Sequence, residues 1–219
     1  MPAWTWRSIT RMKATQSLRI FVHIAGVTPA LVLAWLFFTG GLGINPIQYL
    51  QQKTGVIALI FLLISLACTP AAKLIGWKVM LPRRQALGVY GFLYAASHFL
   101  VFIGLDYGFD ISLIWQDVRS KSYILIGFLA LLLLTPLAIT SLAWFKKRMG
   151  SRWKKLHRLA YVIPIFVLWH FFSSVKGNLA TLQGNLGQPL LFSGLLIILL
   201  MVRLPVVQRR ILAWSGNKP

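Results

Sequence analysis

Six long apolar stretches, separated by shorter polar or basic segments, dominate the chain. Each is close to the roughly 20 residues that a helix needs to cross the hydrocarbon core of a bilayer. Lys, Arg and Asp are absent from the middle of all of them, and glycine and proline gather in the segments between them. The pattern predicts an all-α integral membrane protein, a six-transmembrane-helix bundle that forms a single domain over residues 1–219. The expected spans are residues 20–38, 55–70, 86–105, 122–143, 157–175 and 188–207.

The distribution of basic residues predicts how these helices are oriented. Of the 23 Lys and Arg residues, 19 fall in the N-terminal segment, the 71–84 loop, the 142–158 connection and the C-terminal end, which all lie on one side of the predicted bundle. Cytoplasmic loops of membrane proteins carry an excess of Lys and Arg. We therefore expect both termini to be cytoplasmic, in a multi-pass protein of the bacterial inner membrane. The other four basic residues are Lys53, Arg119, Lys121 and Lys176.

Composition narrows the possible partners. A net charge of +20 would suggest nucleic acid in a soluble protein. Here 58% of residues are hydrophobic and the basic residues flank the apolar stretches, so the expected partner is the lipid bilayer with its anionic inner surface, and no nucleic acid. The single cysteine, Cys68, lies inside an apolar stretch, which excludes an intramolecular disulfide.

Four histidines lie in the predicted spans, where ionisable groups are costly and point to function. The spans contain no Asp or Glu that could pair with them. A neutral imidazole is an iron ligand, and haem in a helical bundle is held by histidines on facing helices. The four are His23, His98, His157 and His170.

Depth in the membrane selects one pair of these histidines. His98 follows Arg84, at the inner boundary, by 14 residues, or roughly 21 Å of helix, and His170 follows Lys154 by 16 residues, or roughly 24 Å. Both imidazoles thus lie toward the outer side, at one level on different helices. We predict that His98 and His170 are the two axial ligands of one b-type haem. The alternative is two unrelated packing histidines.

His157 lies near the inner boundary, as does His23 on the first span. A second haem between them is conceivable, but a histidine in this zone can also be solvated. On an ideal helix the 13 residues from His157 to His170 give a net rotation of roughly 220°, so the two share no face unless Pro164 changes the register.

Arg84 occupies a position where an inner haem ligand could lie, because 14 residues return to within about 40° of the face of His98. A guanidinium group suits a phosphate. The sequence therefore suggests an inner flavin mononucleotide (FMN) site. The alternative is that these basic residues only follow the positive-inside rule. The candidate residues of this site are Arg83, Arg84, Arg152 and Trp153.

Several segments together resemble one known family. They are HIAGVTPALVLAW, GGLGINP, Leu-Ala-Cys-Thr-Pro at 66–70, RRQALGVYGFLYAASHF and KKLHRLAYVIPIFVLWH. They are similar to the MsrQ (formerly YedZ) family, the haem-binding membrane subunits of periplasmic protein-methionine-sulfoxide reductase systems. This family belongs to the ferric reductase-like transmembrane superfamily, with the NADPH oxidases and the six-transmembrane metalloreductases. The resemblance covers roughly residues 15–205.

The resemblance implies specific cofactors. It assigns the haem ligands to His98 and His170, and it matches His157 to a third family histidine associated with haem or with the inner cofactor. The oxidases hold a second, inner haem through a histidine where this chain has Arg84. The MsrQ type resembles a protein with one haem b and one FMN in place of that inner haem.

The resemblance also implies a function. The protein is expected to be an electron-transfer subunit without an active site of its own, passing electrons through FMN and haem b to a periplasmic molybdopterin enzyme that reduces methionine sulfoxide in oxidised proteins. Since the chain ends at Pro219 without the oxidases' NADPH and flavin domain, we expect a separate donor, a cytosolic flavin reductase or the quinone pool.

Docking of the acceptor is expected at the short outer loops 39–53, 106–121 and 174–188. The loop that holds Asp106, Asp110 and Asp117 is one candidate contact, and Lys176 is another. Two alternatives are a transmembrane reductase of ferric iron or oxygen, and a transporter or assembly scaffold without redox chemistry.

Overall fold

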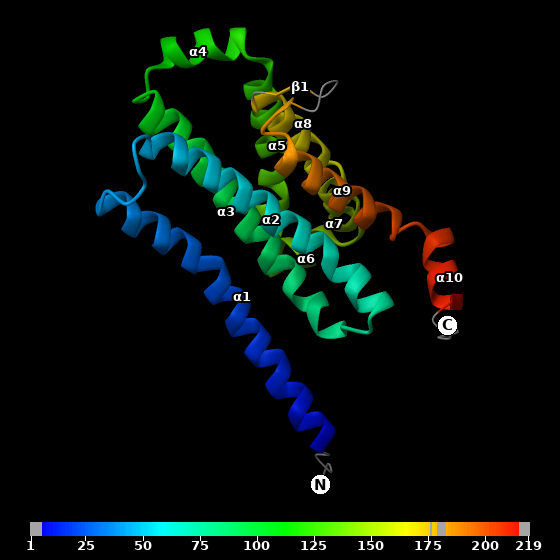
Figure 1. The fold of residues 1–219 in the computed structure, drawn as a ribbon. Helices are drawn as coiled ribbons and strands as arrows, with labels where there is room; N and C mark the ends of the chain where they lie inside the picture. The colour runs from blue at the N-terminus through cyan, green and yellow to red at the C-terminus, as the bar shows by residue number, and fades with distance from the viewer. Residues whose placement is uncertain (1–5, 176, 179–182, 215–219) are drawn as a thin grey trace.

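The computed structural model describes residues 6–175, 177–178 and 183–214, and most of them are helical. Figure 1 shows the long helices side by side, with α4 lying across one end of the bundle. The major helices are α1 (Trp6–Phe38), α2 (Pro46–Leu74), α3 (Arg84–Leu100), α4 (Ile111–Ser120), α5 (Ser122–Ile139), α8 (Ile163–Ser174), α9 (Gly187–Met201) and α10 (Pro205–Trp214). The shorter elements are the helical segments η1 (Lys78–Arg83), η2 (Val101–Asp106), α6 (Ala143–Met149), α7 (Ser151–Leu156) and η3 (His157–Tyr161), and the strands β1 (Gly177–Asn178) and β2 (Gln183–Gly184).

The helical membrane architecture predicted from hydropathy is confirmed. Within the described residues, five helical stretches are long and apolar enough to cross a membrane, and a bent pair formed by α9 and α10 makes a sixth. The cytoplasmic side of the termini and the single-domain organisation stay predictions. We call the end that carries α4 the outer end and the opposite end the inner end. The five stretches are Thr15–Phe38, Pro46–Leu74, Lys78–Asp106, Ser122–Ile139 and Ser151–Ser174.

The sixth span differs from the single helix expected at residues 188–207. Helix α9 has 15 residues, about 22 Å at about 1.5 Å per residue, which is shorter than the roughly 30 Å hydrocarbon core. The chain then bends by 84° into α10. Pro205 explains the bend, because proline lacks an amide hydrogen and disfavours a helical conformation at the preceding residue, Leu204.

Helix α2 lies at the centre of the bundle. In its most apolar part 56% of residues are buried, compared with 17% for each of the other four spans. Its side chains enter three separate apolar clusters, against α1 and α3, against α8 and α9, and against α5 and α8. The helices at the periphery of the bundle direct large apolar side chains away from the protein. On α1, for example, Trp35 is 70% exposed and Phe21 is 65% exposed. These groups suit contact with lipid.

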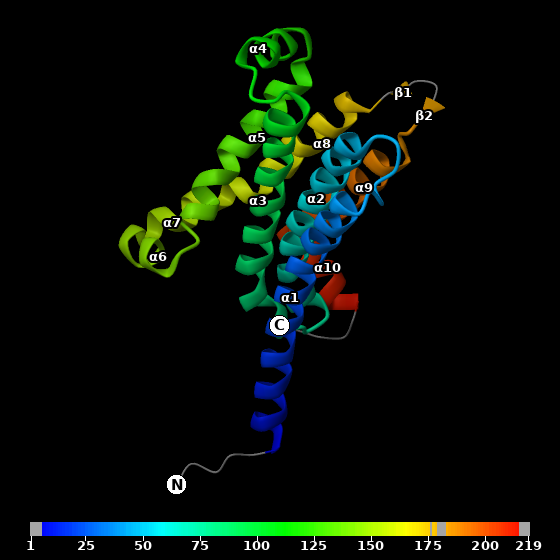
Figure 2. The same ribbon diagram turned by 90° about the vertical axis from the view of Figure 1, so that its left-hand side faces the viewer.

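Two helix pairs form the most extensive interfaces, α2 with α3 and α5 with α8. Both pairs are hairpins that reverse direction at the inner end, opposite α4 (Figure 1). The reversal between α5 and α8 contains α6 and α7, which project sideways from the bundle (Figure 2). The two hairpins enclose the site described below.

Helix α1 is attached to α3 through a tyrosine hydroxyl. Pro29 interrupts the hydrogen bonding of α1. The buried Tyr94 hydroxyl enters this gap, where it accepts from the Ala30 amide at 2.9 Å and donates to the Gly26 carbonyl at 2.8 Å. One side chain of α3 therefore replaces a backbone hydrogen bond of α1, and thereby fixes the position of this otherwise peripheral helix.

We predict that Tyr94→Phe destabilises the protein by about 1–3 kcal/mol, because it removes the hydroxyl that bonds the partly buried Ala30 amide and the buried Gly26 carbonyl. The measurement is unfolding by a denaturing detergent, followed by circular dichroism. Tyr90→Phe is the matched control, since the Tyr90 hydroxyl on the same helix bonds only the exposed His23 side chain. Equal stability of the Tyr94 variant and the parent would show that the inserted hydroxyl does not hold α1.

Candidate functional site

The two helical hairpins enclose a cavity of about 980 Å³. Its volume lies at the upper end of the roughly 300–1,000 Å³ range that is typical of small-molecule and cofactor sites. Apolar side chains of α2, α3, α5 and α8 line most of the cavity, whereas polar and charged groups from the outer ends of the helices and from the outer loops line the outer end. Those groups are Asn45, Gln48, Gln51, Gln52, Asp106, Tyr107, Lys121, Ser174, Asn185 and Gln188.

The structure brings His98 and His170 together in this cavity. Each lies near the outer end of its helix, His98 on α3 and His170 on α8. Their ring centroids are 6.0 Å apart, and the ring planes are inclined at 84°. Two imidazoles from different hairpins therefore face the same space.

Each imidazole is fixed by a backbone carbonyl of the partner helix in its hairpin. His98 Nδ1 lies 2.8 Å from the Gln51 carbonyl oxygen of α2, and His170 Nδ1 lies 2.7 Å from the Tyr123 carbonyl oxygen of α5. Because a carbonyl oxygen can only accept, Nδ1 carries the hydrogen in both rings. In the neutral ring Nε2 then keeps its lone pair, which can bind a metal or accept a hydrogen bond.

A glycine lies beside each imidazole, one helical turn after the carbonyl that holds the ring. A Cβ atom built at Gly127 would lie 2.7 Å from His170 Nδ1, and one at Gly55 would lie 3.1 Å from His98 Nδ1. Any larger residue would therefore crowd the ring. The absence of a side chain lets the imidazole approach the backbone of the neighbouring helix.

The two hairpins thus repeat one arrangement. A carbonyl on the first helix and the histidine on the second helix are separated by 47 residues in both hairpins. This repeat was not predicted from the sequence. Glycines in the middle of two apolar stretches, each at the same distance before a histidine, were the signal that could have revealed it.

Gln51 places a second polar group in the cavity. Its side-chain Nε2 lies 3.3 Å from His98 Nε2. Its Oε1 atom is buried and has no hydrogen-bond partner among the described residues. The cavity therefore contains both metal-binding nitrogens and an amide oxygen that remains available to a bound group.

Three charged or polar side chains meet at the outer mouth of the cavity. Lys121 and Tyr107, which both line it, donate to the Asp117 carboxylate. These bonds, that from Lys121 above all, lower the pKa of Asp117, and the same contact raises the pKa of Lys121. The pKa of Tyr107 is raised, first by burial and then by its bond to the carboxylate. The mouth is therefore closed on one side by an ionic contact between residues of one outer loop.

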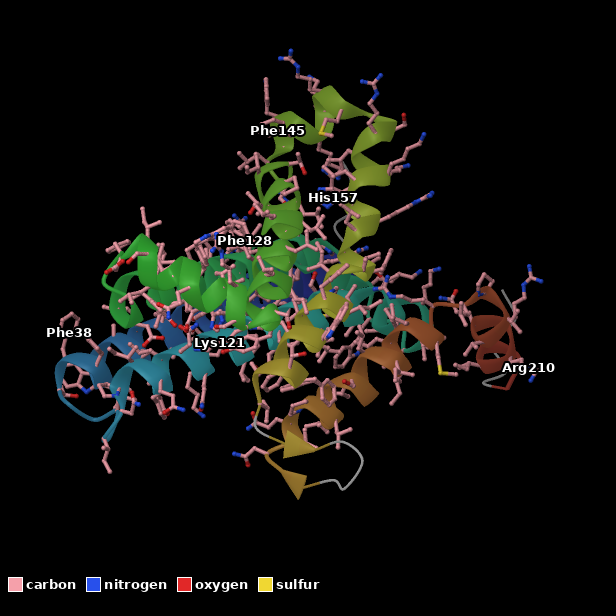
Figure 3. The ribbon with its side chains drawn as sticks, turned by 90° about the horizontal axis from the view of Figure 1, so that it is seen from above. Phe38, Lys121, Phe128, Phe145, His157 and Arg210 are labelled. Carbon is pink, nitrogen blue, oxygen red and sulfur yellow. The ribbon has the colours of Figure 1, made fainter. Side chains whose placement is uncertain are left out.

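At the inner end His157 lies in a separate cluster. Its ring stacks on that of Trp153, with centroids 4.0 Å apart and planes inclined at 26°. Its Nε2 lies 3.0 Å from Thr140 Oγ1, and Trp153 Nε1 donates to the Thr140 carbonyl at 2.8 Å. Figure 3 shows His157 between the ribbon of α5 and that of the following helices, apart from Lys121 and Phe128.

The remaining predicted inner residues are distributed over different surfaces. Arg84 lies over the Tyr161 ring, 5.8 Å from its centroid, and interacts electrostatically with His157. Arg83 instead faces α1 and donates to the Thr15 carbonyl at 3.3 Å. Arg152 is exposed on α7. The structure therefore groups Arg84 with His157, and places Arg83 and Arg152 elsewhere.

His23 is not brought near His157. It lies 3.0 Å from the Tyr90 hydroxyl of α3, whereas the contacts of His157 are with α5 and α7. The rotation expected between His157 and His170 assumed an ideal helix, but the segment from His157 to Tyr161 is a 3-10 helix and Pro164 lies in the first turn of α8. Lys176, a candidate docking residue, lies outside the described residues.

Comparison with known proteins agrees with this architecture. Residues 54–168, which include His98 and His157, match the family described as ferric reductase like transmembrane component. No solved structure matches the chain.

Several relatives carry the name protein-methionine-sulfoxide reductase heme-binding subunit MsrQ. The protein from Rhodospirillum rubrum is 44% identical over 203 residues, which cover 92% of this chain and 93% of the relative. The Bordetella pertussis protein is 34% identical over 212 residues, covering 96% and 98%. The Herminiimonas arsenicoxydans protein is 37% identical over 187 residues, covering 85% and 84%.

The fold and these similarities define the class: the chain is a multi-pass bacterial inner-membrane protein of the ferric reductase like transmembrane family. Within that family it belongs to the MsrQ group, as the similarity to MsrQ proteins along nearly its whole length shows.

The contact between Lys121 and Asp117 at the outer mouth is expected to depend on pH. Since the pKa of Asp117 is lowered in the folded protein, the contact stabilises the mouth above the ordinary carboxyl pKa of about 3.9 and is lost as the pH falls through the lower, folded value. We predict that Lys121→Met moves the pKa of Asp117 back toward about 3.9. Carbon NMR titration of the Asp side chains measures this shift. Arg119→Met is the control, because Arg119 lies over Trp115 instead, 4.8 Å from its ring centroid. Unchanged titration in the Lys121 variant would contradict the assignment.

Proposed function

We propose that the cavity holds one haem b with His98 and His170 as its axial ligands, and that the protein carries electrons across the inner membrane to a periplasmic methionine sulfoxide reductase. One observation carries the proposal: two imidazoles with metal-binding Nε2 atoms face one cavity, 6.0 Å apart between ring centroids. The names of the relatives, which are heme-binding subunits of a protein-methionine-sulfoxide reductase, support it.

The separation of the rings suits a shared iron atom. A bond from a metal to an imidazole nitrogen is about 2 Å long, and the ring centre lies about 1 Å behind that nitrogen, so two axial imidazoles have centres about 6 Å apart. The observed 6.0 Å agrees with this geometry.

The number of ligands that the protein can provide also suits a haem. No group of three or more His, Cys, Asp or Glu side chains gathers in the described part of the chain. A structural zinc ion needs four ligands, whereas haem supplies the nitrogens of its own ring and needs only axial partners from the protein. The apolar walls suit the porphyrin face.

When bound, haem b supplies reversible one-electron transfer at its iron. The chain fixes the tautomer and the direction of both rings through the Gln51 and Tyr123 carbonyls. A hydrogen bond from Nδ1–H to a carbonyl also raises the basicity of the ligand nitrogen. The surrounding helices line the cavity mostly with apolar side chains, and leave its outer end near the loops where an acceptor can dock.

The acceptor we propose is a molybdopterin-containing enzyme that repairs oxidised methionine in periplasmic proteins. The outer loops and α4 provide the docking surface, since they lie nearest the polar end of the cavity (Figure 1). Transfer over a short distance requires the acceptor to bind there. The subunit itself needs no substrate site for the sulfoxide.

At the inner end we propose an FMN that receives electrons from a cytosolic flavin reductase or from the quinone pool. Arg84, Trp153 and His157 are the residues that would hold it. The stacked Trp153 and His157 rings offer an aromatic surface for the flavin, and the Arg84 guanidinium offers a charge for its phosphate. FMN would accept two electrons from the donor and pass them one at a time to the haem.

The test of the haem site is substitution of its ligands. We expect His98→Ala and His170→Ala, purified in detergent, each to lose the low-spin Soret and α-band absorbance, because one imidazole cannot maintain a six-coordinate low-spin iron. Thr140→Ala at the inner end should retain both bands. A normal spectrum in both histidine variants would exclude this pair as the ligands.

The glycine beside His170 gives a finer prediction. We expect Gly127→Ala to reduce haem content or shift the Soret band, because its methyl group would overlap the imidazole that the Tyr123 carbonyl holds. Gly55→Ala should have a smaller effect, since its contact is 3.1 Å rather than 2.7 Å. Gly194→Ala is the matched control in a membrane helix, because nothing lies within 4 Å of its added Cβ. The measurement is haem per protein by the pyridine haemochrome method, and equal haem in all three variants would show that the glycines do not position the rings.

A further inference from the structure

Two guanidinium groups meet on one tyrosine ring at the inner end of the bundle. Arg203 Cζ lies 4.7 Å and Arg84 Cζ 5.8 Å from the centroid of Tyr161. The three residues come from three different parts of the chain, the start of α3, the segment η3 and the bend after α9. The two arginines also lie within electrostatic range of each other and of the buried Cys68.

Arg203 is held inside the bundle by α2. Its Nη2 donates to the Leu66 carbonyl, and its Nε atom is buried without a hydrogen-bond partner among the described residues. The bend between α9 and α10 places Arg203 in this position, whereas Arg209 and Arg210 beyond the bend are exposed. Arg203 therefore differs from Arg209 and Arg210, whose side chains are exposed.

The chain cannot neutralise this pair of cations by itself. It contains three acidic residues, and all of them lie in the outer loop between Asp106 and Asp117, at the other end of the bundle. Burying a cation without a counter-charge is costly, and two cations in proximity add their mutual repulsion. An anion from outside the chain would relieve both effects.

We propose that Arg84, Arg203 and Tyr161 form a binding site for a phosphate group at the inner end of the bundle. Guanidinium groups bind phosphate oxygens through paired hydrogen bonds, and the tyrosine hydroxyl adds one more donor. The phosphate can belong to FMN, in which case the site rests on the proposed function, or to an anionic phospholipid of the inner leaflet. Arg203 and Tyr161 thereby join Arg84 as binding residues.

The experiment uses the purified full-length protein and the variants Arg84→Gln and Arg203→Gln. Arg210→Gln is the matched control, because it removes the same charge from an exposed position on α10, far from the bundle (Figure 3). Affinity for FMN and for riboflavin, which lacks the phosphate, is measured by flavin fluorescence. Retained phosphatidylglycerol is measured by native mass spectrometry after delipidation and re-addition of that lipid.

If the phosphate belongs to FMN, we expect both variants to bind FMN roughly tenfold to a hundredfold more weakly, with little change for riboflavin. If it belongs to a lipid, both variants lose the phosphatidylglycerol adduct while flavin binding is unchanged. Arg203→Lys, which keeps the charge but not the paired donors, should give an intermediate loss. Parent-like binding of both probes by both glutamine variants would overturn the site.

Two further measurements separate this proposal from the others. Elution as a single monodisperse species in size-exclusion chromatography shows that a variant is folded, independently of any cofactor. The haem spectrum of the same samples reports the outer cavity alone. If the parent protein contains no haem, the proposed function is refuted and the phosphate result still stands. If the parent contains haem, but the parent and the glutamine variants bind FMN and phosphatidylglycerol equally well, only the phosphate site is refuted.

Discussion

The hydrogen bonds from His98 Nδ1 and His170 Nδ1 to backbone carbonyls are the interactions on which the rest of the structure depends. In the interior of a membrane protein, water is not available to satisfy a polar side chain, so each imidazole needs a protein partner. A carbonyl already bonded within its helix has a second lone pair to offer, but only to a group that comes close to the helix surface. Gly55 and Gly127 make that approach possible. The choice of glycine in two helices therefore determines the tautomer of two histidines, and with it the nitrogen that each ring presents to the cavity.

The same imidazole–carbonyl contact occurs in two equivalent hairpins of the bundle. Helices α2 and α5 provide the carbonyl and the glycine, and helices α3 and α8 provide the histidine. Two such units facing each other create a site that neither could form alone, because each supplies one ring only. The arrangement is that of a parallel repeat related by an axis along the helices, as in some transporter folds. The remaining helices, α1 and α9, cover the outside of the hairpins, and α2 packs against both of them.

The two ends of the bundle differ in their chemistry because the charges are separated along it. The acidic residues lie only at the outer end, where Asp117 pairs with Lys121 at the mouth of the cavity. At the inner end, Arg84 and Arg203 share the Tyr161 ring without a carboxylate. An outer site of neutral imidazoles suits a metal in a cofactor, and an inner site of guanidinium groups suits an anion. This polarity is what the proposed arrangement, with haem at the outer end and FMN at the inner end, would need.

The sequence by itself determined the membrane class, the approximate limits of five spans, and the juxtaposition of His98 and His170, because hydrophobic length and depth are properties of a straight helix. It also singled out Arg84. It could not determine that Arg83, the neighbouring residue, turns toward α1, or that Arg203 from the sixth span reaches the same tyrosine as Arg84. Those outcomes depend on the 3-10 segments at η1 and η3 and on the bend after α9, where the rotation per residue is no longer that of an α-helix. The spacing of Gly55 and Gly127 before the two histidines can be read in the sequence, but the carbonyls that hold the imidazoles act across helices and could not be identified from it. Only the packing of the hairpins determines which backbone carbonyl each imidazole contacts.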